Sequence, residues 1–187
     1  MSHGLIVSLV VIAITNFGSV ALADDADSNE PFITEFRGGL LAHDVSGLWS
    51  GSHEESGVDI NLELLFRPVG PEVLDGIIRP AVGASINNVG DTSHYYVDLL
   101  WEKRLDNGLF FDIGLGLAWH DGEKDMVTDT SRKQLGTRFQ FHVPIDVGFT
   151  FLDRHRLALS FQHLSNAGLG DENEGLDTLG LRYSILF

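Results

Sequence analysis

The sequence contains no cysteine, and this absence removes several kinds of site at once. A disulfide scaffold, a zinc site with cysteine ligands and a thiol nucleophile are all excluded for this chain of 187 residues. Basic residues are also scarce, because 12 Lys and Arg stand against 27 Asp and Glu, which gives a formal net charge of −15. Proteins bind nucleic-acid phosphates mainly through Lys and Arg, so we expect no nucleic-acid partner. The length fits one domain with its own core.

The chain also lacks an apolar run long enough for a transmembrane helix, which needs about 20 residues. The most apolar stretch, Leu5 to Ile14, is followed by Ala21-Leu22-Ala23, the small-x-small pattern of a signal-peptidase site. We therefore predict a signal peptide over residues 1–23 and a mature domain over residues 24–187. A non-cleaved anchor stays open as the alternative, because no Lys or Arg precedes the apolar run.

Methionine is rare, with 2 residues, whereas the chain has 21 Gly and 12 Phe. Glycine costs a helix interior about 1 kcal/mol relative to alanine, so this composition favours strands. From Val58 to Phe66, apolar residues occupy every second position, which is the period of a strand with one apolar face. Such alternation predicts strands over 58–66, 78–87, 94–102, 111–120, 138–151, 157–161 and 179–187. A first strand over 33–45, whose facing is ambiguous, brings the number to eight.

Eight strands are the number found in the smallest bacterial outer-membrane barrels, and an even number closes the sheet. A soluble barrel of the lipocalin type shows the same alternation, so the polar face decides between the two. That face carries charges of both signs, which suit a hydrogen-bonded lumen, and the apolar face carries large aromatics such as Trp101 and Trp119. The polar set is Asp59, Glu63, Arg79, His94, Asp98, Glu102, Asp112, Arg138, His142, Asp146, Arg156 and Arg182.

The end of the chain supports the membrane interpretation. Leu181, Tyr183, Ile185 and the terminal Phe187 alternate in a way that resembles the C-terminal strand read by outer-membrane assembly machinery. We therefore predict an all-β, eight-stranded, antiparallel, up-and-down transmembrane β-barrel of the bacterial outer membrane, with both termini periplasmic. The short turns at 68–75, 106–108 and 153–155 are then periplasmic, and the longer segments at 46–56, 89–92, 121–133 and 166–176 lie outside.

Prolines inside two of these strands work against regular pairing. Pro80 and Pro144 each remove one backbone donor from the ladder. We expect a local bulge at each of them.

The alternation also places polar residues where apolar ones belong. Continuing by twos from Leu157 puts His163 and Ser165 on the lipid-facing side, about 6.5 Å apart at Cα, which lets an imidazole serve as base for a serine nucleophile. Counting back from Phe187 puts Asp177 on the same side of the neighbouring strand. The three residues supply the roles of a hydrolase triad near the lipid headgroups. The simpler interpretation is that His163 and Ser165 end a strand at the membrane interface.

Two segments around these residues resemble a known family. His163-Leu164-Ser165-Asn166-Ala167-Gly168, followed by Asn173-Glu174-Gly175-Leu176-Asp177, is similar to the signature of the PagL-type lipid A 3-O-deacylases. The resemblance implies that Ser165 is the nucleophile, His163 the base, and Asn166 with the Gly168 backbone the oxyanion region. The family's acid is usually Glu, whereas the aligned residue here is Asp177, one methylene shorter. Glu174 stays open as the alternative acid.

The resemblance implies an outer-membrane serine esterase that hydrolyses the 3-O-linked acyl chain of lipid A, with lipopolysaccharide and outer-membrane lipids as its partners. It implies no cofactor and leaves a homodimer open. Two other functions stay open, namely a non-catalytic surface or adhesion barrel and a lipid acyltransferase that uses the same acyl-enzyme.

Two further clusters are better explained without catalysis. His120, Asp121, Glu123 and Asp125 lack a recognisable metal-ligand spacing, so we interpret them as a solvated charge run and predict no metal. The inward carboxylates Asp59, Glu63, Asp98 and Glu102 could form an acid-base pair, but a structural network in the lumen explains them better.

Overall fold

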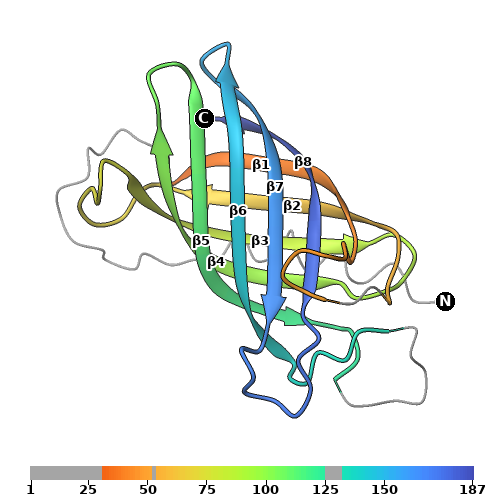
Figure 1. Cartoon of the computed structure of the whole chain (residues 1–187). Helices are drawn as coiled ribbons and strands as arrows, with labels where there is room; N and C mark the ends of the chain where they lie inside the picture. Colours follow the sequence, from red (N-terminus) through yellow and green to blue (C-terminus); the bar gives the residue numbers. More distant parts are fainter. Residues whose placement is uncertain (1–30, 52–53, 125–131) are drawn as a thin grey trace.

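The computed structural model describes residues 31–51, 54–124 and 132–187, so the predicted signal peptide lies outside the described residues. Every regular element in this part of the chain is a strand, and no helix there is long and apolar enough to cross a membrane. The strands are β1 (Ile33–Ala42), β2 (Val58–Phe66), β3 (Ile77–Asn87), β4 (His94–Arg104), β5 (Leu109–His120), β6 (Phe139–Phe151), β7 (His155–Ser165) and β8 (Leu176–Leu186). They follow one another around a closed antiparallel barrel in which β8 pairs with β1 (Figure 1). The predicted eight-stranded barrel is confirmed.

The two faces of the strands differ as the alternation predicts. In β5, Phe111, Ile113 and Leu115 point out of the barrel and are exposed, whereas Asp112 between them is buried in the lumen. Leu115 has 61% of its surface exposed. An outer wall of this kind is unfavourable in water, at about 25 cal/mol per Å² of apolar surface, and is suited to lipid.

The lumen holds a network of buried ion pairs. Arg37 contacts Asp112 at 2.7 Å and Asp146 at 3.0 Å, and Arg79 contacts Glu102 at 2.8 Å. The ambiguous facing of the first strand is thereby resolved, because Arg37 and its neighbour Glu35 both point inward.

The four carboxylates considered above as an acid-base pair also have buried partners. Asp59 lies 2.8 Å from His43, Glu63 lies 3.2 Å from Arg182, Asp98 lies 2.9 Å from His142, and Glu102 pairs with Arg79. These contacts match the interpretation as a structural network. Removing one partner of such a buried pair typically destabilises a protein by about 3–5 kcal/mol.

The expectation of bulges at the two prolines is wrong, since the strand register is continuous through both. Pro80 pairs with Leu99, and the β2–β3 ladder ends at Ala81, so the proline there has a paired strand on one side only. Pro144 interrupts the β5–β6 pairing without shifting it. Its ring is accommodated by Gly114, where a Cβ would lie 2.9 Å from the proline Cγ. The register shifts instead between Ile33 and Glu35.

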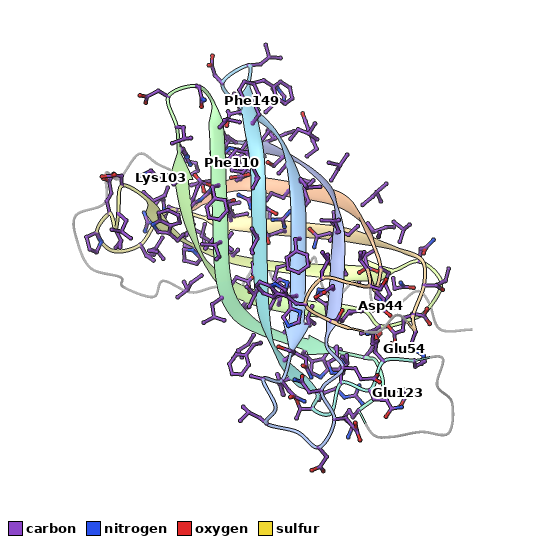
Figure 2. All side chains as sticks on the ribbon, viewed as in Figure 1. Asp44, Glu54, Lys103, Phe110, Glu123 and Phe149 are labelled. Atoms are coloured by element: carbon purple, nitrogen blue, oxygen red, sulfur yellow. The ribbon has the colours of Figure 1, made fainter. Side chains whose placement is uncertain are left out.

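The two ends of the barrel differ in the length of their connections. The N–H of Phe187 donates to the carbonyl of Thr34 at 3.0 Å, so the last described residue lies beside the start of β1, at the end with the shorter turns. The described residues of the connections 43–57, 88–93, 121–138 and 166–175 lie at the other end, where Figure 2 shows Asp44, Glu54 and Glu123. The two longest connections, 43–57 and 121–138, are at this end, although 88–93 is shorter than the 67–76 connection at the opposite end. The first strand ends at Ala42, earlier than the predicted Val45, because Asp44 turns the chain with a φ of 50°.

Candidate active site

His163 and Asp177 face each other across the β7–β8 ladder, near its long-loop end. They are directly paired in the register, and His163 Nδ1 lies 2.6 Å from Asp177 Oδ1. Both are on the outer side of the barrel, in phase with the exposed Leu157 and Leu159. When Nδ1 donates its proton to the carboxylate, Nε2 carries a lone pair and can act as a base.

Ser165 follows two residues later on the same face and is half-buried. Among the described residues, no hydrogen bond engages its hydroxyl or His163 Nε2. At the usual strand rise the two Cα atoms are about 6.5 Å apart, so a side-chain rotation can bring the hydroxyl to the imidazole.

The second oxygen of Asp177 is held by a different part of the chain. Its Oδ2 accepts the backbone N–H groups of Trp49 and Ser50, each at 2.7 Å, from the connection between β1 and β2. The ring of Trp49 lies edge-on to His163, with 5.1 Å between centroids. From the sequence, this segment is expected only to be part of an outer loop. No local sequence signal links it to a carboxylate 127 positions away in the chain.

Glu174, the alternative acid, has another partner in this structure. Its Oε2 accepts the N–H of Gln134 at 2.6 Å, and its own N–H donates to the Gln134 carbonyl at 3.3 Å. The carboxylate therefore ties the β7–β8 connection to the β5–β6 connection. Of the two candidate acids, Asp177 is the one in contact with His163.

The two residues expected to form the oxyanion region are already hydrogen-bonded. The buried Asn166 donates from Nδ2 to the carbonyls of Leu135, at 3.0 Å, and Glu172, at 2.6 Å. Its Oδ1 accepts the N–H of Gly168 at 2.8 Å. These bonds shape the loop after Ser165, and an oxyanion would have to exchange with them to bind either donor. The oxyanion role of Asn166 and Gly168 stays a prediction.

Close packing beside His163 depends on Gly175, for which the sequence alone indicates no role. Its φ is +67°, and a Cβ there would lie 3.3 Å from His163 Cε1 and 3.2 Å from the Leu164 carbonyl oxygen. A side chain at this position would strain the backbone and press on the imidazole.

An apolar groove of about 230 Å³ lies on the outer wall, next to Trp49. It is lined by Leu48, Trp49, Ile145 and Phe161, and Trp49 packs on Phe161 with 5.3 Å between ring centroids. Since Phe161 precedes His163 by two residues on the same face, the groove leads along the strand toward the imidazole. Its lining suits a hydrocarbon chain.

The connection that carries Trp49 also contains buried polar groups. His43 lies between Glu55, at 2.9 Å, and Asp59, at 2.8 Å. Burial alone lowers the pKa of His43, but hydrogen bonds and charge from Asp59 and Glu55 outweigh it and raise the pKa to about 9. Burial raises the pKa of Glu55, but hydrogen bonds from His43 and Thr92 outweigh it, and the net shift is downward.

The residues considered above as a metal cluster do not converge. His120 Nε2 contacts the Thr137 carbonyl at 2.7 Å, Asp121 accepts the N–H of Ser93 at 2.7 Å, and Glu123 is exposed. Asp125 lies outside the described residues. No group of three or more His, Cys, Asp or Glu within the described ranges could hold a metal ion.

Comparisons with known proteins bear on both the fold and the site. A crystal structure of the outer membrane enzyme PagL superposes with a TM-score of 0.60 at 19% identity, covering 81% of this chain and 98% of that one. The N-terminal β-barrel domain of Pseudomonas aeruginosa OprF superposes with a TM-score of 0.51 at 11% identity, covering 83% and 98% of the two chains. At these identities the likeness shows a shared barrel fold.

Sequence comparison adds a relative and a family. Lipid A deacylase PagL from Bordetella bronchiseptica is 38% identical over 60 residues, which cover 32% of this chain and 34% of that relative, so the match spans about a third of its length. The family model described as lipid A 3-O-deacylase (PagL) matches residues 78–185, more than half of the chain and the whole of the β7–β8 site. The chain belongs to the lipid A 3-O-deacylase (PagL) family.

Proposed function

We propose that this protein is an outer-membrane serine esterase that hydrolyses the ester-linked acyl chain at position 3 of lipid A. The observation that carries the proposal is the 2.6 Å contact between His163 and Asp177 on the outer wall of the barrel, with Ser165 two residues away on the same face. Membership of the deacylase family supports the same reaction and substrate.

In the proposed reaction, His163 Nε2 removes the proton of Ser165 as the hydroxyl oxygen attacks the ester carbonyl. The tetrahedral intermediate collapses, the sugar hydroxyl leaves with the proton from His163, and the acyl chain stays on Ser165 as an ester. Water, activated by the same imidazole, then releases the fatty acid. Asp177 keeps the proton on Nδ1 and stabilises the imidazolium that forms in both steps. The reaction needs no cofactor.

The location of the site suits a substrate that already lies in the membrane. A triad on the outer wall meets the ester bond of a neighbouring lipid without a passage through the lumen, which is filled by the Arg37 network. The apolar groove at Trp49 and Phe161 would hold the acyl chain that is cleaved. This arrangement requires the long connections to face outward and both termini to face the periplasm.

Mass spectrometry of lipid A from cells that carry the wild-type or the Ser165→Ala protein tests the proposal. We expect wild-type cells to accumulate lipid A lacking one ester-linked acyl chain, and the variant to lose at least about 10³-fold in rate, because the nucleophile is absent. Ser46→Ala, an exposed serine at the same end of the barrel, is the matched control and should retain activity.

Three outcomes would contradict the proposal in different ways. Turnover above about a tenth of wild type in Ser165→Ala would exclude the serine mechanism, since removal of a nucleophile costs orders of magnitude. Transfer of the released chain to another lipid would identify an acyltransferase. An unchanged lipid A profile would favour a surface or adhesion barrel.

A further inference from the structure

The carboxylate of Asp177 is held from two sides. Oδ1 meets His163 at 2.6 Å, while Oδ2 accepts the N–H groups of Trp49 and Ser50 at 2.7 Å each. The backbone carbonyl of Asp177 also accepts the N–H of Val45 at 2.9 Å. As a result Asp177 is fully buried although it lies on the outer wall, whereas Ser165 on the next strand is partly exposed.

Two N–H donors on one oxygen restrict the rotation of a carboxylate. Hydrogen bonds to an ionised acceptor are short and roughly twice as strong as neutral ones, so together they hold the Asp177 side chain in one rotamer. In that rotamer the other oxygen is aimed at His163. The ring of Trp49, at 74° to the imidazole, in addition limits rotation of His163.

We propose that the Trp49–Ser50 segment is a positioning element of the catalytic centre, and that the buried Glu55 anchors it. This inference rests on the proposed function, because positioning has a meaning only for an enzyme that uses Asp177. The segment contacts the acid and the base but not the reacting serine, so it acts through Asp177 and His163.

Glu55 follows Ser50 in the same connection and links three connections through four hydrogen bonds. Its Oε2 contacts His43 Nε2 at 2.9 Å and accepts the Thr92 N–H at 3.1 Å. Its Oε1 accepts the Thr92 hydroxyl at 2.9 Å and the Lys133 N–H at 3.1 Å. Glutamine cannot replace these interactions, because its NH₂ group would face at least one of the two backbone N–H donors.

The structural part of the inference can be measured without any turnover. In full-length protein in detergent micelles, we expect the amide protons of Trp49 and Ser50 to exchange at least tenfold faster in Asp177→Ala than in wild type. The amides of Glu54 and Glu55 are internal controls, since they donate to Asp44 at 2.7 and 2.9 Å and should not change. Equal exchange of Trp49 and Ser50 in both proteins would overturn the proposed contact.

The catalytic part of the inference is tested by a substitution of Glu55. We expect Glu55→Gln to lower kcat on lipid A in micelles about tenfold, because Asp177 is held less firmly. KM should rise as well, since the loosened segment also carries Leu48 and Trp49 of the groove, so kcat is the parameter that reports positioning. Glu123→Gln is the matched control, with the same charge change in an exposed side chain at the same end of the barrel (Figure 2). Faster exchange at Trp49 and Ser50 in Glu55→Gln with an unchanged kcat would overturn the positioning role.

A second pair of variants keeps the test decisive if Glu55→Gln does not fold. Trp49 is an exposed side chain, so Trp49→Ala should fold, and we expect its kcat to fall about fivefold or more while Trp49→Phe restores it by keeping a ring against His163. A change confined to KM in Trp49→Ala would show that the ring only contacts the acyl chain, and would remove it from the positioning element.

Failure of the inference and failure of the proposed function give different results. A wild-type protein that hydrolyses no lipid A overturns the proposed function and with it the catalytic part. Slow exchange of Trp49 and Ser50 that depends on Asp177 would still support the structural part in that protein.

Discussion

At the scale of single residues, the pairing of His163 with Asp177 shows that an aspartate is long enough to reach the imidazole in this candidate site. Directly opposed residues in antiparallel strands have Cβ atoms about 4.5–5.5 Å apart. An aspartate opposite a histidine therefore reaches Nδ1 without a further methylene, and the observed distance is 2.6 Å.

This geometry leads to a prediction about the acid. Asp177→Asn should slow hydrolysis by about 10² to 10⁴, because an amide cannot hold the required tautomer or stabilise imidazolium. Glu174→Gln should change the rate by less than about threefold, since its contact is to the Gln134 backbone and a glutamine oxygen still accepts that bond. Lipid A hydrolysis by both purified variants decides between them. An active Asp177→Asn with an inactive Glu174→Gln would assign the acid to the loop.

At the scale of elements, the connections of the long-loop end behave as one unit. Glu55 joins three of them, and the Asn166 amide and Glu174 carboxylate join the fourth to 121–138. The connection that carries Trp49 is therefore joined to its neighbours through Glu55, which in turn contacts His43.

The stability of this unit should depend on the charge of His43. Its pKa is about 9 in the folded protein, above the usual value of 6.5. A raised pKa means that the stabilisation is complete below about pH 6.5 and is lost as the pH rises through 9. A shift of this size corresponds to at most about 3 kcal/mol. The free energy of unfolding, measured with urea in micelles, should decline between pH 7 and pH 10, and the decline should be smaller in His43→Gln. An identical pH profile in both proteins would contradict the assignment.

At the scale of the whole molecule, closure of the barrel determines where the site lies. Because the number of strands is even, the start of β1 and the end of β8 lie at the same end of the barrel. The β7–β8 site lies at the opposite end, with the long connections. A charged lumen and an apolar wall leave the outer surface as the place where a lipid can be bound.

Orientation in the membrane can be tested with single cysteines, because the chain has none of its own. Glu123→Cys, at the long-loop end, should react with a membrane-impermeant maleimide on intact cells. Asp106→Cys, in the turn between β4 and β5, should react only after the cells are permeabilised. Both side chains are exposed, so accessibility of the thiol within the protein does not limit either reaction. Reaction of Asp106→Cys on intact cells would invert the proposed topology.

The sequence by itself determined the number of strands, the two faces of every strand but the first, and three residues of the candidate site. Strand alternation is a local property of the backbone, so counting by twos was sufficient to put His163, Ser165 and Asp177 on one face. Tertiary structure decided what local periodicity does not encode. In the closed barrel Arg37 points inward, and Gly114 accommodates the ring of Pro144 without a bulge. In the folded connections Asn166 is hydrogen-bonded to Leu135, and Trp49 and Ser50 contact Asp177. These contacts join residues far apart in the chain, and they form only once the sheet has closed and its connections have packed together.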